Sequence, residues 1–393
     1  MVDIRTIFCY AATMNKKSIK FFQYDVLLDK EDICNREKEI AALIAAAKAN
    51  KRIVLLAPRR YGKTSLVKNV VGSAMSEAHP KRLVLAVDFM GVESLSSIAA
   101  RLEHGLSRAL AESFSPANLL KRAADMFKKL SMRIDVDPIT SAPSVSIGLR
   151  SDDDRKNILS LLDGITELSD KQPLMLILDE FQDIIFVPEA EGLIRSFLQQ
   201  LSKSSIFILG SKRHLMERMF GNSNAPLFQF GDEMHFSPIA YEAWEPYFSE
   251  RLKPLGINIS ADGLKYLLDR MCHVPNAICE LGAWIQERCS GKILETADVE
   301  TALNDMVEAK QAYAYRMTGM SEGEKELLMT IAKKGFVAEP HGADFIRELR
   351  ISKSGVGKML QKLLDAGIVE QEIEKGWRLS DPVFAHYLSR LSS

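Results

Sequence analysis

Cysteine is scarce in this sequence. The 393 residues include five cysteines, at positions 9, 34, 272, 279 and 289, and no two have the spacing of a metal-binding pair. An odd, scattered set argues against a disulfide framework and against a zinc site. Long hydrophobic runs are missing too: no stretch approaches the ~20 apolar residues of a membrane helix, and the first residues lack a signal-peptide pattern. We therefore expect a cytoplasmic protein in a reducing compartment, with no membrane partner.

An excess of charge of one sign is also missing. The chain has 51 Lys and Arg against 52 Asp and Glu, a net charge of −1. Bulk charge therefore argues neither for nor against nucleic acid, and only a local patch could. Hydrophobic residues make up 47% and charged residues 26%, which is ordinary for a globular protein, and the length predicts two or three domains.

Short apolar runs alternate with helical patterns from about residue 36 to 240. Buried strands separated by helices predict a parallel sheet covered on both faces, a three-layer α/β fold with five strands. Two alternating runs within 132–150 predict an inserted hairpin. The strands are expected at 53–57, 82–90, 173–180, 205–211 and 233–237, and the helices at 36–49, from 62 onward, at 94–112, 116–130, 153–168 and 190–202.

The pattern changes twice after this core. Residues 241–317 show only helical patterns and predict a small all-α unit. Residues 318–393 predict three helices and then a hairpin around Lys375 and Gly376. We place the core at 25–240 and treat residues 1–24 as an N-terminal extension, whose first thirteen residues are either a mis-assigned start, with Met14 the true one, or a disordered tail.

The segment 54-VLLAPRRYGKTSLVKNVV-71 has the order strand, turn, helix that a phosphate-binding loop requires. Lys63 would reach the outer phosphates, and Thr64 would hold magnesium through its hydroxyl. Gly62 permits the close approach of the backbone to the anion. Glycine is expected where Ala57 stands, but alanine is small enough to need only a modest backbone adjustment. The candidate nucleotide-binding residues are Ala57, Pro58, Arg59, Arg60, Tyr61, Gly62, Lys63, Thr64 and Ser65.

A second motif is the apolar run that ends in Asp179 and Glu180. Carboxylates at the tip of a strand buried on both faces are expected to face a ligand. Asp179 would hold Mg²⁺, and Glu180 would orient and deprotonate a water that attacks the γ-phosphate of ATP. Ser211, the last residue of the run at 205–211, is the candidate for a polar contact to that phosphate or water; by itself this signal is weak, since Gly-Ser is a common turn.

Together these residues resemble the archaeal-type P-loop ATPases within the AAA+ and STAND assemblage. The specific strings are 57-APRRYGKTSL-66 and 209-LGSKRHLMERMF-220, supported by 33-ICNREKEI-40, 87-VDFMGVESL-95, 174-LMLILDEFQ-182 and 380-SDPVFAHYL-388. The resemblance implies the layout of origin-initiator ATPases: an ATPase core, a helical lid at 241–317 and a C-terminal winged helix at 318–393.

The resemblance also implies roles for residues outside the loop. Arg36 would lie near the nucleotide, although Asn35 replaces the family's glycine. Pro275 would pack on the adenine as part of the lid motif, in which His273 replaces a glycine. No arginine finger is identified, and Arg213 and Arg218 would be guesses.

The C-terminal region leaves two roles open. Ser352 is expected to cap a helix whose lysines, Lys353, Lys358 and Lys362, could enter a DNA groove. The region is neutral, with eleven basic and eleven acidic residues, and its wing carries three glutamates at 370, 372 and 374 that would share one face. A DNA-binding wing should present cations, so docking to a protein or autoinhibition is at least as well supported.

These observations predict an ATPase that hydrolyses ATP slowly with Mg²⁺ and uses the cycle to switch the arrangement of core, lid and winged helix. The alternative is a nucleotide-dependent DNA-binding or signalling regulator with little turnover, since no arginine finger is evident. ATP, ADP and an unidentified protein are the expected partners, and DNA or self-association are further options.

Overall fold

The computed structural model describes residues 19–113, 131–136, 143–148, 153–349, 351–372 and 376–391. The expected helix at 116–130, the start of the chain and Glu374 lie outside the described residues. In the described part, no helix is long and apolar enough to cross a membrane, and the four described cysteines are free.

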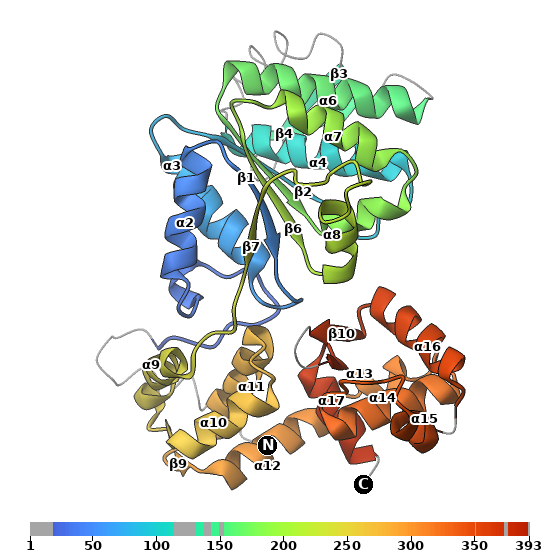
Figure 1. Ribbon diagram of the computed structural model, residues 1–393. Coiled ribbons are helices and arrows are strands. Elements are labelled where there is room, and N and C mark those ends of the chain that lie inside the picture. The colour runs from blue at the N-terminus through green and yellow to red at the C-terminus, as the bar shows by residue number, and fades with distance from the viewer. Residues whose placement is uncertain are drawn as a thin grey trace.

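A five-stranded sheet forms the centre of the core, with the order β2-β5-β6-β1-β7 (Figure 1). All neighbouring strands are parallel, as predicted. The strands are short and apolar, which suits a sheet buried on both faces. Their bounds are β1 Arg52–Leu56, β2 Leu83–Asp88, β5 Leu174–Asp179, β6 Ser205–Gly210 and β7 Asp232–His235.

Helices cover both faces of this sheet and make a three-layer α/β core (Figure 1). Alternate residues along each strand enter two separate apolar clusters: Leu55 and Phe207 belong to one, Val54 and Ile208 to the other. The first face carries α2 (Glu37–Lys48) and the helix after β1, which is π-helical over Ser65–Gly72 and continues as α3 (Ser73–Glu77). The opposite face carries α4 (Leu95–Ser113), α6 (Asp154–Lys171), α7 (Ala190–Gln200) and α8 (Arg213–Phe220).

A hairpin occupies the segment in which one was expected. Its strands, β3 (Ser131–Val136) and β4 (Pro143–Gly148), pair antiparallel. The hairpin forms a sheet of its own, and β4 lies along α4. It is therefore an addition to one side of the core and does not extend the central sheet.

The helical unit that follows, called the lid here, comprises five helices and one feature that periodicity did not predict. A two-residue parallel pair, β8 (Asn258–Ile259) with β9 (Ile293–Leu294), ties two of its connections together. Such a pair is too short to leave an alternating pattern in the sequence. The helices are α9 (Tyr241–Leu252), α10 (Ala261–Arg270), α11 (Pro275–Arg288), α12 (Thr296–Ala309) and α13 (Ala312–Arg316).

The C-terminal domain has the predicted helix-helix-helix-hairpin order, closed by a further helix. Ser352 is the N-cap of its third helix, as expected, and its side chain accepts a hydrogen bond from the N–H of Gly355 at 3.2 Å. Gly376 begins the second wing strand with φ +95°, and a Cβ there would lie 2.3 Å from the Val337 carbonyl, so only glycine fits. The elements are α14 (Glu322–Lys334), α15 (Ala343–Leu349), α16 (Lys353–Asp365), β10 (Val369–Glu372), β11 (Gly376–Leu379) and α17 (Pro382–Leu391).

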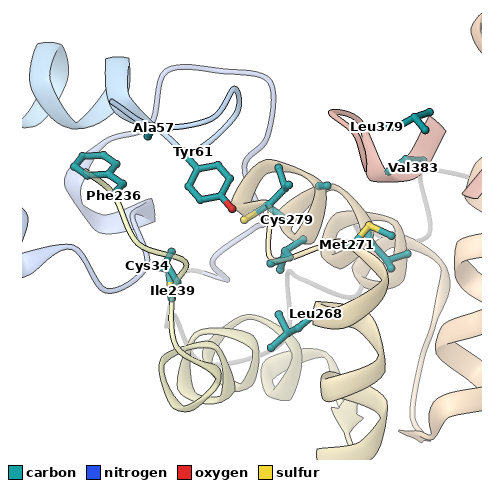
Figure 2. Packing of buried hydrophobic residues seen from close by; sticks show 14 of the residues in the cluster. Cys34, Ala57, Tyr61, Phe236, Ile239, Leu268, Met271, Cys279, Leu379 and Val383 are labelled. Carbon is teal, nitrogen blue, oxygen red and sulfur yellow. The ribbon is translucent and has the colours of Figure 1, made fainter. Parts of the chain in front are cut away.

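The three parts of the chain are joined by one buried apolar cluster. It extends from the first face of the sheet through Tyr61 after β1, Cys279 of α11 and Val383 of α17 (Figure 2). The lid and the C-terminal domain lie beside each other on one side of the core (Figure 1). Burial of this kind stabilises the packing of the three parts against one another.

The segment before α2 also joins core and lid. The Phe22 ring lies against Gly282 of α11, where a Cβ would be 2.7 Å from the ring. The N–H of Phe22 donates to Gln286 Oε1 at 3.1 Å, and the N–H of Leu28 donates to Ser65 Oγ at 3.0 Å. The chain thus passes the lid and then the start of the π-helical segment before it enters α2.

Candidate functional site

The loop between β1 and its helix folds around the side chain of Lys63. The Lys63 ammonium is buried and donates to the carbonyls of Ala57 at 2.7 Å and Pro58 at 2.9 Å. Gly62 has φ +81°, in the left-handed region that favours glycine. A lysine ammonium beside the N-terminus of a helix creates a local positive potential, which suits the binding of an anion.

Burial lowers the pKa of Lys63 from its ordinary value to about 8, and the nearby charges of Glu180 and Asp179 oppose the shift. The loop lysine and the two carboxylates at the end of β5 therefore lie close together, although 116 and 117 positions separate them in the sequence. Parallel strands bring this about, because their carboxyl ends meet at one edge of the sheet.

Thr64 and Asp179 form a pair that suits magnesium. The Thr64 hydroxyl donates to Asp179 Oδ2 at 2.6 Å. Burial raises the pKa of Asp179, while this hydrogen bond lowers it, so a cation would relieve the burial of a negative charge. In the described part of the chain, no group of three or more His, Cys, Asp or Glu is placed to hold a metal by itself. The residues fit Mg²⁺ that takes its remaining ligands from phosphate and water.

Glu180 and Ser211 are brought together from two neighbouring strands. Ser211 Oγ donates to Glu180 Oε2 at 2.7 Å. Glu180 has φ +46° and ψ +39°, a left-handed backbone that costs a non-glycine residue about 1 kcal/mol or more and is common at functional sites. A third residue, Gln182, donates to the same carboxylate oxygen at 2.5 Å. We did not single out Gln182 from the sequence, although it ends the string 174-LMLILDEFQ-182.

Arg59, Arg60 and Tyr61 extend away from the loop toward the other parts of the chain. Arg60 forms an ion pair with Asp381 at the start of α17, with 3.1 Å between Nη1 and Oδ2. Arg59 packs against Gly367, where a Cβ would be 2.9 Å from its Nη1. Tyr61 is buried, and burial raises its pKa to about 12. These three side chains link the loop to the C-terminal domain and the lid.

Pro275 lies next to the loop, whereas Ser65 and Arg36 are engaged elsewhere. Pro275 is the first residue of α11, and the N–H of its neighbour Asn276 donates to the Arg60 carbonyl at 3.3 Å. Ser65 Oγ accepts the Leu28 N–H described above.

Arg36, directly before α2, contacts the segment that follows β7. It pairs with Glu39 at 2.6 Å, donates to the Ser237 carbonyl at 2.8 Å and stacks on the Phe236 ring. Among the described residues, no hydrogen bond joins Arg36 to the loop. The N–H of Phe236 donates to the carbonyl of Leu56, which directly precedes the loop residue Ala57, so a role of Arg36 near the nucleotide stays a prediction.

The two arginines considered as fingers lie on α8. Arg213 is exposed and paired with Glu217 at 2.7 Å within that helix, and Arg218 lies near Glu191 of α7. Lys212, just before α8, pairs instead with Asp183 at 3.4 Å. Lys212, rather than either arginine of α8, thus lies against the turn that follows Glu180.

Comparison with known proteins supports this architecture. A family model described as "Probable winged helix domain" matches residues 311–390, which starts at α13, a few residues before the predicted boundary. No curated protein matches the chain.

Three solved archaeal structures resemble the whole chain. The Walker-type ATPase PABY2304 of Pyrococcus abyssi is 16% identical with a TM-score of 0.62, covering 93% of this chain and 99% of that one. The ORC2 protein of Aeropyrum pernix, in ADPNP and ADP complexes, is 14% identical with a TM-score of 0.52, covering 95% and 100%. The ORC1 protein of Aeropyrum pernix in complex with DNA is 14% identical with a TM-score of 0.51, covering 93% and 94%. The chain has the fold of the P-loop ATPases, with a winged helix at its C-terminus.

Proposed function

We propose that this protein binds ATP with Mg²⁺ at the 57–64 loop and hydrolyses it slowly. The observation that carries the proposal is the convergence of a buried lysine, a hydroxyl–carboxylate pair and a second carboxylate at one edge of the sheet. Phosphoryl transfer needs little more than positioning and compensation of charge. The five residues that would supply these are Lys63, Thr64, Asp179, Glu180 and Ser211.

Each residue has a distinct role in this proposal. Lys63 would leave the carbonyls of Ala57 and Pro58 and bind the outer phosphates, so the loop must rearrange when nucleotide enters. Thr64 and Asp179 would hold Mg²⁺, which neutralises charge on the phosphates. Glu180 would orient the attacking water and take its proton, with Ser211 holding the carboxylate in place. Slow turnover is expected because none of these groups is an arginine that stabilises the transition state.

The expected activity is tested by measuring steady-state phosphate release from ATP. We expect release that depends on Mg²⁺ and stops when EDTA is added. Release equal to that of a buffer blank, from protein that is folded by circular dichroism, would refute the proposed hydrolysis.

Nucleotide affinity should fall as the pH rises above about 8, because the protonated Lys63 binds phosphate and the neutral amine does not. Once the free lysine is neutral, the loss approaches about tenfold per pH unit. Binding should also take up a proton near pH 8, since phosphates restore the charged form. Titration calorimetry from pH 7 to 9.5, in buffers of different ionisation enthalpy, measures both effects. A constant affinity over this range would show that Lys63 does not contact the phosphates.

The coupling of the site to domain arrangement rests on Asp381. This carboxylate receives Arg60 of the loop and Arg316 of α13, each at 3.1 Å. It also caps α17 by accepting the N–H groups of Val383 and Phe384, each at 3.1 Å. Burial raises its pKa, but Arg60, the Phe384 N–H and Arg316 outweigh that effect, so the pKa is lowered. One carboxylate thus connects the phosphate loop with α13 and with α17 of the C-terminal domain.

The wing adds a second connection near Lys63. Arg378 of β11 is buried between Glu370 and Glu372 of β10 and forms ion pairs with both. Burial raises the pKa of Glu370, whereas Arg378 and Lys63 lower it, so the acidic side of the wing faces the loop. Phosphates of a nucleotide would repel this side. We therefore propose that nucleotide binding and release shift the winged helix relative to the core.

Replacing Asp381 with asparagine should loosen the winged helix without removing the α17 cap. Asparagine keeps an acceptor oxygen for the two N–H groups, but it loses the charge that pairs with Arg60 and Arg316. We expect the docked state to lose about 1–2 kcal/mol. Hydrogen–deuterium exchange at 57–64 and 376–391 should therefore become faster by about fivefold or more.

The matched control for this variant is Asp344→Asn, which removes an exposed carboxylate of α15 in the same domain. We expect its exchange to equal that of the unmodified protein. Equal exchange in Asp381→Asn would mean that the ion pairs do not hold the winged helix in place.

A nucleotide-dependent DNA-binding regulator is the second candidate. Lys353 and Lys358 of α16 are exposed, and the resembling ORC1 structure is a complex with DNA. Against it, Lys362 pairs with Glu324 at 2.6 Å and the wing faces the core. Binding of duplex DNA with a steep salt dependence, lost in Lys353→Ala/Lys358→Ala, would favour this candidate. If the protein does not bind duplex DNA in this way, we propose that its partner is another protein or a second copy of the chain.

A further inference from the structure

Gln182 is a fully buried polar residue in the turn after β5. It has 0% exposure and lies in a 3₁₀-helix, Phe181–Phe186, for which Glu180 is the N-cap. A buried amide is stable only when its donors and acceptor find partners. All of its partners belong to the end of the sheet where the proposed site lies.

The orientation of this amide follows from its contacts. The main-chain N–H of Ser211 can only donate, and it lies 3.2 Å from Gln182 Oε1. The carbonyl oxygen therefore faces β6, and the NH₂ group must face Glu180, whose Oε2 is 2.5 Å from Nε2. Chemistry thus determines which end of the amide meets the carboxylate.

The consequence is an asymmetric Glu180 carboxylate. Its Oε2 accepts from both Gln182 Nε2 and Ser211 Oγ. In the described part of the chain, its Oε1 accepts no hydrogen bond, so one oxygen is fixed and the other is left for a water. A proton acceptor works only when it is within hydrogen-bond reach of the proton it removes, so fixing Oε2 determines where Oε1 points.

A purely structural role for Gln182 is less well supported. The adjacent Asp183 already ties the turn to its surroundings: it accepts the Gly91 N–H at 2.9 Å and pairs with Lys212 at 3.4 Å. Phe181 and Ile184 of the same turn are buried in the apolar cluster of that face. Gln182 adds to this turn only a long hydrogen bond, from its Nε2 to Asp183 Oδ1 at 3.4 Å, and its shortest contact is to Glu180 at 2.5 Å.

We propose that Gln182 is a positioning residue for the hydrolysis reaction: it links the end of β6 to Glu180 and aims the free carboxylate oxygen at the attacking water. The inference rests on the proposed ATPase function. It adds a residue that acts through Glu180 without touching the nucleotide, so its loss should change turnover and leave nucleotide affinity unchanged.

The test uses Gln182→Met in the full-length protein, since methionine keeps the length and removes both polar ends. We expect kcat for ATP to fall about tenfold to a hundredfold, while the Kd for a fluorescent ATP analogue with Mg²⁺ stays within about twofold. Without nucleotide, a crystal structure of the variant should show the Glu180 carboxylate displaced from Ser211. The matched control is Gln200→Met on the exposed end of α7, which should leave kcat, Kd and melting temperature unchanged.

Four outcomes overturn the inference. They are an unchanged kcat, a higher kcat, a Kd that weakens in proportion to kcat together with a lower melting temperature, and a Glu180 carboxylate that stays on Ser211 in the variant structure. If the unmodified protein hydrolyses ATP, each of these four outcomes refutes the role of Gln182 and leaves the proposed ATPase function intact. If the unmodified protein releases no phosphate, the proposed function fails first, and the inference fails with it.

Discussion

Lys63→Ala will abolish tight binding of Mg-ATP. The change removes the ammonium that lies at the centre of the loop, and each hydrogen bond to a charged group is worth about 1.5–3 kcal/mol. Loss of two such bonds weakens binding by roughly a hundredfold or more. Without nucleotide the variant should stay folded, since a buried cation whose pKa is lowered to about 8 contributes little to stability.

Titration calorimetry with ATP and Mg²⁺ measures this effect. The control is Lys171→Ala, which removes an exposed lysine at the end of α6 on the opposite face of the sheet. If Lys63→Ala binds Mg-ATP within about threefold of the unmodified protein, with the control unchanged, the phosphates are not held by this loop.

Glu180→Gln will keep nucleotide binding and lose turnover. The amide oxygen of the new side chain can still accept from Ser211 Oγ and Gln182 Nε2. Its NH₂ group then points where Oε1 of the glutamate was, and it cannot take a proton from water. We expect kcat to fall about a hundredfold to a ten-thousandfold, as is usual when a general base is removed, with little change in Kd.

Phosphate release and nucleotide affinity must be measured on the same preparation. The control is Glu167→Gln on the exposed side of α6, for which both quantities should be unchanged. Normal hydrolysis by Glu180→Gln would mean that another group activates the water, and the roles proposed for Ser211 and Gln182 would be wrong as well.

Much of the fold was predictable because its determinants are local. Apolar runs of about five residues separated by helical patterns predict a parallel sheet, and this is what the five strands form. The winged helix was predictable for a similar reason, since Ser352 and the apolar stripe of α16 mark one helix unambiguously. The β8–β9 pair was not predicted, because strands of two residues are too short to show an alternating pattern of apolar and polar residues.

The site divides in the same way. Residues within recognisable motifs, such as Lys63 in the loop after β1 and Glu180 directly after β5, could be proposed from the sequence around them. The partner Asp381 of Arg60, the neighbour Gly367 of Arg59 and the Ser237 carbonyl that binds Arg36 could not, because each is 200 residues or more distant in the sequence. Periodicity carries no information on such pairs.

The sequence by itself determined where the strands end, which loop can wrap an anion, and which carboxylates follow the neighbouring strand. Only the tertiary structure decided what these groups contact: that the loop arginines turn to the winged helix, that Asp381 joins the loop to α13 and α17, and that Gln182 binds Glu180. The physical reason is that backbone pattern depends on neighbours along the chain, whereas ion pairs and buried amides depend on which surfaces the packed helices bring together.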